Sequence, residues 1–188
     1  MSDLKQIADH ENALDLYFND MFAEPMHDIV TSQAKHVTKD DHSTAFQALL
    51  IDINGLQLAI RTEEVKAILP WPETSLEQTP DTAHNELVMG LYNYASQQLK
   101  VINTANIVLP LEHRHNLATP SFLIIIGQGN FALSCHKINT VINLLPEDIR
   151  WRKNMTSRPW LAGIAMKKNC SIVSLDGLVN LLSPINLA

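Results

Sequence analysis

The residue pairs that could perform chemistry are few in this sequence. Cys135 is followed directly by His136, a thiol beside an imidazole that could serve as nucleophile and base. His113 and His115 lie in EHRH (112–115), where two imidazoles could ligate a metal, but no third ligand is evident. Because neighbouring residues of a strand point to opposite faces, the Cys135 thiol and the His136 ring would face apart. We therefore expect no catalytic residue, no bound metal and no cofactor.

A second group of residues is suited to binding rather than to reaction. The segment DIRWRKNMTSRPWLAG (148–163) concentrates basic and indole side chains in a chain whose formal net charge is −6. These side chains are Arg150, Trp151, Arg152, Lys153, Arg158 and Trp160. Tryptophan and arginine are enriched at the energetic centres of protein interfaces, and guanidinium groups pair well with carboxylates. We predict that this segment contacts an acidic region of a partner protein.

Two other interpretations of this segment stay open. Trp151 and Trp160 could close the ends of the fold, with the arginines in solvent at the rim. Nucleic acid could bind the arginines, but residues 46–188 carry equal numbers of acidic and basic side chains, and residues 1–45 are acidic. The acidic part would repel phosphate, and no nucleic-acid-binding motif is present. We therefore expect no nucleic-acid partner.

Composition places the chain among globular proteins. Its 188 residues are 46% hydrophobic, enough for one core or two small fused ones. No run approaches the roughly 18 apolar residues of a membrane span, and the first residues lack the basic and apolar build of a signal peptide. Cys135 and Cys170 stand in apolar alternation, which is typical of reduced core thiols. We expect a cytoplasmic protein without membrane insertion.

The acidic N-terminal part contains one amphipathic helical pattern. In ALDLYFNDMF (13–22) the apolar residues recur at i, i+3, i+4, i+7 and i+8, which indicates one stripe of a helix. The stripe consists of Leu14, Tyr17, Phe18, Met21 and Phe22. We predict an acidic amphipathic helix within residues 1–23 and a polar linker over 24–44. The stripe could pack on the body of the protein or occupy a groove of a partner.

The body of the chain, residues 45–185, contains one pattern twice. The matching segments are LLIDINGLQLAI (49–60) with LIIIGQGNFALSC (123–135), and VMGLYNY (88–94) with LAGIAMK (161–167). The second match aligns Gly90 with Gly163. Each half contains about five alternating strands, short turns and little helix. This pattern predicts a mainly β domain of two small antiparallel barrels.

The repeated body resembles the CheW-like domain, the chemotaxis adaptor fold of two intertwined five-stranded antiparallel β-barrels with short helices. The segments that carry the resemblance are LQLAIRTEEVKAIL (56–69), VMGLYNYASQQLKVINTANIVL (88–109), FALSCHKINTVINLLPEDI (131–149) and WLAGIAMKKNCSIVSLDGLVNLL (160–182). The resemblance implies a non-enzymatic adaptor that binds a CheA-type histidine kinase and chemoreceptor tips. An enzyme or a small-ligand module is the alternative class.

One hairpin departs from the usual adaptor pattern, which reads Gly-Val-Ile-Asn-Leu-Arg-Gly. Gly90 and Asn93 match it, whereas Ala95 stands in place of the arginine and Ser96 in place of the final glycine. The family uses that arginine for contacts within the signalling array. A second candidate contact surface in this hairpin consists of Leu91, Tyr92 and Tyr94.

Three segments are similar to the divergent ParP-like branch of the family: ILPWPE (68–73), PEDIRWR (146–152) and RPWLAG (158–163). Members of that branch join the kinase and the receptors to polar positioning machinery. The similarity implies a location at the cell pole and a ParC-type ATPase as a further partner. By the internal repeat, Trp71 begins the excursion of the first half that is equivalent to the basic tryptophan segment, and we add it to the predicted contact residues. The alternative is a conventional CheW-type protein that couples receptors to the kinase.

Overall fold

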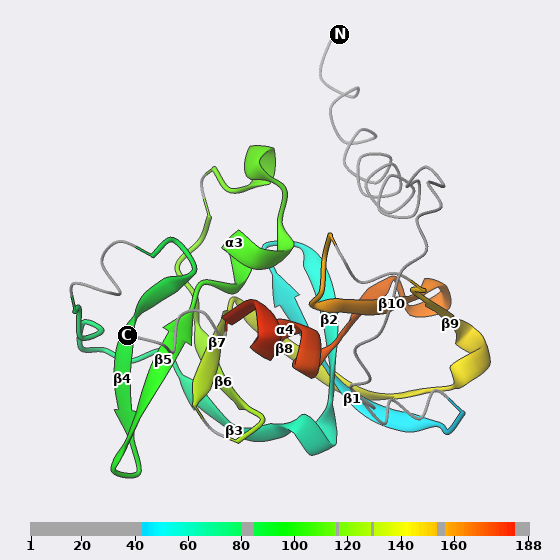
Figure 1. Cartoon of the computed structure of the whole chain (residues 1–188), viewed down its shortest axis with the longest axis horizontal. Coiled ribbons are helices and arrows are strands. Elements are labelled where there is room, and N and C mark those ends of the chain that lie inside the picture. The colour runs from blue at the N-terminus through cyan, green and yellow to red at the C-terminus, as the bar shows by residue number, and fades with distance from the viewer. Residues whose placement is uncertain (1–42, 80–84, 116, 129, 154–156, 183–188) are drawn as a thin grey trace, which may run out of the picture. The chain divides into compact units, whose positions relative to one another are not determined.

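The computed structural model describes residues 43–79, 85–115, 117–128, 130–153 and 157–182, which form a mainly β domain (Figure 1). Its strands are β1 (Phe46–Ile53), β2 (Leu56–Arg61), β3 (Val65–Pro70), β4 (Val88–Tyr94), β5 (Gln97–Ile102), β6 (Phe122–Ile126), β7 (Phe131–Cys135), β8 (Lys137–Leu144), β9 (Ile149–Trp151), β10 (Leu161–Ala165) and β11 (Cys170–Val173). Its helices are α3 (Thr104–Val108), α4 (Leu175–Leu182) and the 3-10 turns η1 (Thr62–Glu64), η2 (Leu111–His113), η3 (Pro146–Asp148) and η4 (Met166–Lys168). The stripe predicted in the N-terminal helix (Leu14, Tyr17, Phe18, Met21 and Phe22) lies outside the described residues.

The position of each strand in its sheet explains its hydrophobic pattern. In β3, which lies at an edge, half-buried Val65, Ala67 and Leu69 alternate with exposed residues. In β7, which lies in the middle of its sheet, every residue is buried, including Ser134. An edge strand with one solvated face needs strict alternation, whereas a strand covered on both faces accepts a continuous apolar run.

Two sheets contain all of these strands, and each sheet draws on both halves of the repeat. The six-stranded sheet has the order β8-β1-β2-β11-β10-β9, and the five-stranded sheet has the order β3-β6-β7-β5-β4. The hairpin β1–β2 of the first half therefore lies between two strands of the second half. The hairpin β6–β7 of the second half lies between two strands of the first. This exchange of hairpins confirms the intertwined CheW-like arrangement.

The observed sheets differ in two details from the expected arrangement of five antiparallel strands in each half. The pairs β2–β11 and β5–β7 are parallel. In each pair, one strand belongs to an exchanged hairpin and the other belongs to the opposite half of the repeat. One sheet also has a sixth strand, β9, which pairs with β10. Among the described residues, the equivalent position in the other sheet holds a single bridge, between Glu77 and Leu91.

Gly90 and Gly163 occupy equivalent places in the two sheets. A register shift precedes each of them, in β4 and in β10 respectively. A Cβ atom on Gly163 would lie 2.7 Å from the carbonyl oxygen of Arg150, and one on Gly90 would lie 2.9 Å from that of Glu77. Both glycines are therefore needed because a neighbouring backbone passes too close for any side chain.

Apolar residues pack on both faces of the central strands. One core cluster belongs to the six-stranded sheet and contains Ala48, Leu50, Ala59, Leu144, Ile149, Ala162, Ala165, Cys170 and Ile172. A second belongs to the five-stranded sheet and contains Leu99, Val101, Leu123, Ile125 and Ala132. On the exchanged hairpins, the residues that alternate with the cluster residues point to the other face of the strand, and they are also fully buried. Examples are Ile51, Leu58, Ile124 and Leu133. They face the side on which β1 and β7 meet.

Candidate protein-interaction surface

Trp151 is held at the edge of the six-stranded sheet by a strand of three residues. Within β9, Ile149 is buried, Arg150 is exposed and Trp151 is half-buried. Arg150 pairs with Ile164 and Trp151 pairs with Gly163 of β10. The alternation of the strand therefore turns the Arg150 guanidinium outward and the indole toward the barrel core.

The Trp151 indole packs against the first strand of the domain. Its ring centroid lies 6.4 Å from that of Phe46, and the planes are tilted by 41°. The Arg61 guanidinium carbon lies 3.9 Å from the centroid of the Phe46 ring, within cation–π range. Arg61, Phe46 and Trp151 thus form a row, although β9 lies far in the sequence from the β1–β2 hairpin.

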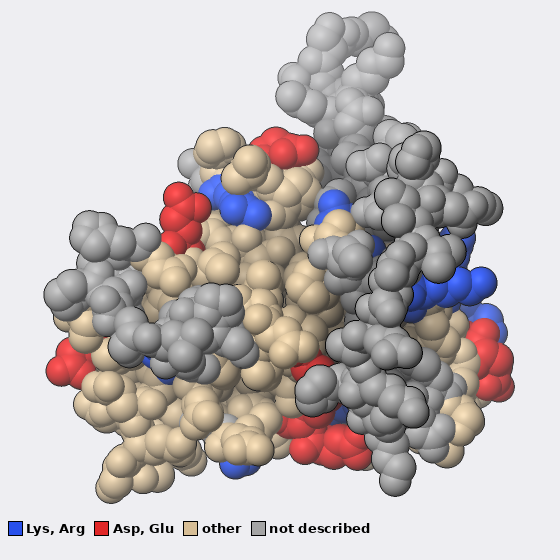
Figure 2. All heavy atoms as spheres, viewed as in Figure 1, with Lys and Arg blue, Asp and Glu red and all other residues tan. Residues whose placement is uncertain are grey.

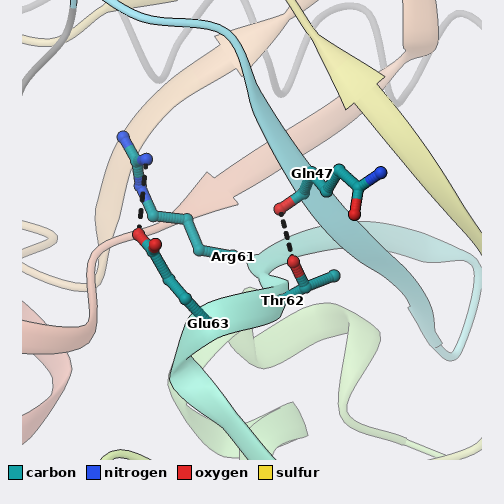
Figure 3. A network of polar contacts seen from close by, with 4 residues as sticks. All are labelled: Gln47, Arg61, Thr62 and Glu63. Atoms are coloured by element: carbon teal, nitrogen blue, oxygen red, sulfur yellow. Dashed lines mark hydrogen bonds and ion pairs between the residues drawn. The ribbon is translucent and has the colours of Figure 1, made fainter.

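One carboxylate lies beside the Arg61 guanidinium, and a hydrogen bond from the next residue joins β2 to β1. Its Nη1 lies 3.8 Å from Glu63 Oε1, and the Arg61 side chain is only 14% exposed (Figure 3). At the adjacent residue, Thr62 Oγ1 donates to the Gln47 carbonyl oxygen at 3.3 Å and joins the end of β2 to β1. The Glu63 carboxylate thus lies beside the guanidinium that covers the Phe46 ring.

The arginines of the tryptophan segment differ in their roles. Arg152 Nη1 donates to the carbonyl oxygen of Arg158 at 3.0 Å, and Nη2 donates to Ser157 Oγ at 3.4 Å. Arg152 therefore braces the segment between β9 and β10, whereas Arg150 and Lys153 are exposed. Figure 2 shows basic side chains beside β9 and β10, with acidic side chains close to them.

Two of the predicted contact residues are buried, which corrects the expectation that they lie at a surface. Trp160 is only 3% exposed, and its carbonyl oxygen accepts a hydrogen bond from Ser174 N at 2.7 Å. Leu91 is 8% exposed, and its backbone pairs with Glu77 on one side and Lys100 on the other. Trp160 directly precedes β10, and Leu91 lies within β4. The inward face of each of these strands contributes to the core.

The remaining predicted residues belong to the five-stranded sheet. Trp71 and Tyr92 are half-buried against its core cluster, and Trp71 N donates to the Ser121 carbonyl oxygen at 2.8 Å. Tyr94 is 37% exposed at the tip of the β4–β5 hairpin, where Ala95 and Ser96 have positive φ angles. Such angles suit the tight turn of a two-residue hairpin. The structure therefore assigns the predicted residues to two different sheets.

Sequence reasoning missed Phe46 and Arg61 at the Trp151 site. Phe46 begins β1 and Arg61 ends β2, so both lie at one end of the hairpin, near the pair Ala48–Arg61. A pattern that is local in the sequence cannot reveal that β9 brings Trp151 to the same place. The only sequence signal is an arginine that directly follows the apolar alternation of β2.

Cys135 and His136 do not form a nucleophile and base. Burial, with a smaller effect of the Asp52 carboxylate, raises the pKa of the Cys135 thiol from 9.0 to about 12. Burial likewise raises the pKa of Cys170 to about 11. The His136 ring instead contacts the Ala118 carbonyl oxygen through Nε2 at 2.8 Å. Within the described ranges, no group of three or more His, Cys, Asp or Glu residues could hold a metal ion.

We expect both thiols to resist alkylation in the folded protein. At about pH 8, iodoacetamide should label Cys135 and Cys170 about a hundredfold or more slowly than it labels the urea-unfolded chain, because burial keeps the thiols protonated. The same raised pKa values contribute stability that is present below pH 9.0 and is lost as the pH rises through about 11 and 12. Mass spectrometry of the labelled chain measures the rates, and fast labelling without denaturant would contradict the prediction.

The family of the chain follows from comparison with known proteins. Residues 47–183 match the family model of the CheW-like domain. The chain belongs to the CheW-like domain family, and this membership supports a non-enzymatic scaffold or adaptor of chemotaxis. No curated protein matches the chain.

One solved structure illustrates the shared fold. The chain is similar to the scaffolding protein TtCheW from Thermoanaerobacter tengcongensis, with a TM-score of 0.56 and 16% sequence identity. The similarity covers 69% of this chain and 88% of that one. Among the described residues, no helix has both the length and the hydropathy that a membrane crossing requires.

Proposed function

We propose that this chain binds a CheA-type histidine kinase and chemoreceptor tips through separate surfaces. One of them, which we call the Trp151 surface, consists of Phe46, Arg61, Arg150, Trp151 and Arg152. The second is the tip of the β4–β5 hairpin around Tyr94. By holding two partners at once, such a domain raises their local concentration without any chemistry.

The observation that carries this proposal is the packing around Trp151. Its indole is half-buried against the core and packed at a tilt beside Phe46, so a partner would meet a side chain that is already ordered. An ordered aromatic side chain loses little entropy on binding. The exposed Arg150 beside it supplies a charge for an acidic helix of the partner. We assign this surface to the kinase.

The ParP-like segments favour a specialised adaptor over a conventional coupling protein. In such an adaptor, a ParC-type positioning ATPase is a third partner and the arrays lie at the cell pole. Ala95 occupies the place where the usual hairpin carries an arginine, which supports a receptor contact of a different kind. A conventional protein would retain kinase and receptors equally in a pull-down, whereas the specialised one would retain the kinase more firmly than the receptors.

Reversing one charge tests the assignment of the Trp151 surface. We expect Arg150→Glu to weaken kinase binding about thirtyfold, the equivalent of a hot-spot loss of about 2 kcal/mol. The matched control is Lys66→Glu, which makes the same charge change at an exposed position on β3 of the other sheet. Titration calorimetry with the purified kinase measures both affinities. Equal affinities for wild type and Arg150→Glu would remove this surface from the mechanism.

A further inference from the structure

The outer edge of β8 is the least protected edge of the two sheets in the described part of the chain. β9 is three residues long and carries an exposed arginine, and the outer side of β4 is bridged by Glu77. β3 contains Lys66 and ends at Pro70, which has no N–H to donate. β8, in contrast, has eight residues, contains no proline and ends the order of its sheet. An edge of this kind is a template for another strand.

Two exposed apolar side chains lie along this edge. Val141 is 48% exposed and Leu145 is 44% exposed, and exposed Asn143 lies between them. The intervening Ile142 is half-buried and Leu144 is buried, so the alternation is regular. Leu145 keeps an extended backbone, with φ −97° and ψ 140°, although it follows the last residue of the strand. The outward row is therefore Val141, Asn143 and Leu145.

We propose that this row is the contact strand of a homodimer, in which β8 pairs antiparallel with β8 of a second copy about a two-fold axis at Asn143. The register of β8 against β1 shifts between Ile138 and Val141, so the regular part of the edge begins at Val141. A two-fold axis at Asn143 places Val141 opposite Leu145 of the second copy. It also places Ile142 opposite Leu144 of the second copy. Each exposed apolar side chain thereby gains an apolar neighbour.

The chemistry of the segment favours a second copy of the same chain over a different partner. Residues 138–146 contain no charged side chain, so two copies meet without like-charge repulsion close to the axis. The Asn143 amide has both donors and an acceptor, and it can therefore pair with its own symmetry mate. The dimer rests on β8 rather than on the proposed kinase contact, although Phe46 of the Trp151 surface pairs with Leu144 of β8.

Sedimentation of the full chain tests the dimer. We expect a reversible dimer at raised protein concentration, and we expect Val141→Lys to weaken it about tenfold or more, because each copy then places a charge against Leu145 of the other. The matched control is Ile68→Lys, since Ile68 is 42% exposed on β3, the equivalent edge of the other sheet. A monomer at every concentration, or equal weakening by both variants, would overturn the proposal.

Disulfide cross-linking tests the pairing register without placing a charge on the β8 edge. Two Asn143→Cys chains would place their Cα atoms about 5 Å apart across the axis, which suits a disulfide. Two Asn139→Cys chains would place them roughly 25 Å apart along the strand, too far to bridge. We expect mild oxidation to link Asn143→Cys and not Asn139→Cys. Equal linking of both variants, or linking of Asn139→Cys alone, would overturn the axis at Asn143.

Discussion

Replacing Gly177 by alanine is expected to lower the free energy of unfolding by about 3 kcal/mol. A Cβ atom at this position of α4 would lie 1.7 Å from the carbonyl oxygen of Pro159 and 3.2 Å from Ser174 Oγ. The obstacle is backbone, which cannot rotate away, so either α4 or the segment before β10 must shift. The shift would also disturb Trp160, whose carbonyl oxygen bonds Ser174 N. Urea denaturation followed by circular dichroism measures the loss.

The sign of the effect makes this substitution informative. In an unobstructed helix, alanine in place of glycine stabilises by about 1 kcal/mol, so a loss at Gly177 must come from packing. Asn180→Ala is the matched control, because Asn180 is exposed in the same helix. We expect that control to change stability by less than about 0.5 kcal/mol. A Gly177→Ala protein as stable as wild type would show that α4 does not pack tightly on Pro159.

Replacing Gly163 by alanine is expected to cost about 2 kcal/mol of stability and to weaken kinase binding as well. The new Cβ atom would lie 2.7 Å from the Arg150 carbonyl oxygen and 3.2 Å from the Trp151 Cα. Because β9 pairs only with β10 among the described strands, it would be pushed off the sheet edge. The Trp151 surface would lose the strand that positions it. Denaturation and calorimetric titration of the same protein measure the two effects.

Gly90→Ala provides the comparison, since Gly90 is the equivalent residue of the five-stranded sheet. Its Cβ atom would lie 2.7 Å from the Leu76 Cβ and 2.9 Å from the Glu77 carbonyl oxygen, and its φ of +146° adds backbone strain. We expect a similar loss of stability with unchanged kinase affinity. If both variants bound the kinase equally well while folded, the position of β9 would not matter to binding.

Much of the fold follows from patterns that are local in the sequence. The alternation in β3 and the turn at Gly55 reflect backbone requirements within a few residues, and the repeated glycines Gly90 and Gly163 mark equivalent places of the duplication. Such requirements are met in any correct fold of the chain, so the mainly β class and the duplication could be predicted. The resemblance to CheW-like domains supplied the exchange of hairpins, which no periodicity could reveal.

The candidate surface was predictable only in part, because burial depends on strands that are distant in the sequence. Trp151 and Trp160 stand in the same basic segment, yet Trp151 is half-buried at the sheet edge and Trp160 is buried. Residue type could not separate them, since both are large amphipathic side chains beside an arginine or a proline. The difference arises from pairing: β9 leaves Trp151 at a sheet edge, whereas Trp160 leads directly into a central strand.

The amino-acid order alone therefore specifies where strands begin and turn, where a side chain is forbidden, and which segment is basic and aromatic. The folded structure adds the partners: Phe46 and Arg61 beside Trp151, and a β8 edge on which Val141 and Leu145 are exposed among the described residues. The physical reason is that periodicity and steric limits act between near neighbours in the chain. Exposure and stacking instead depend on which distant strands the sheets bring side by side.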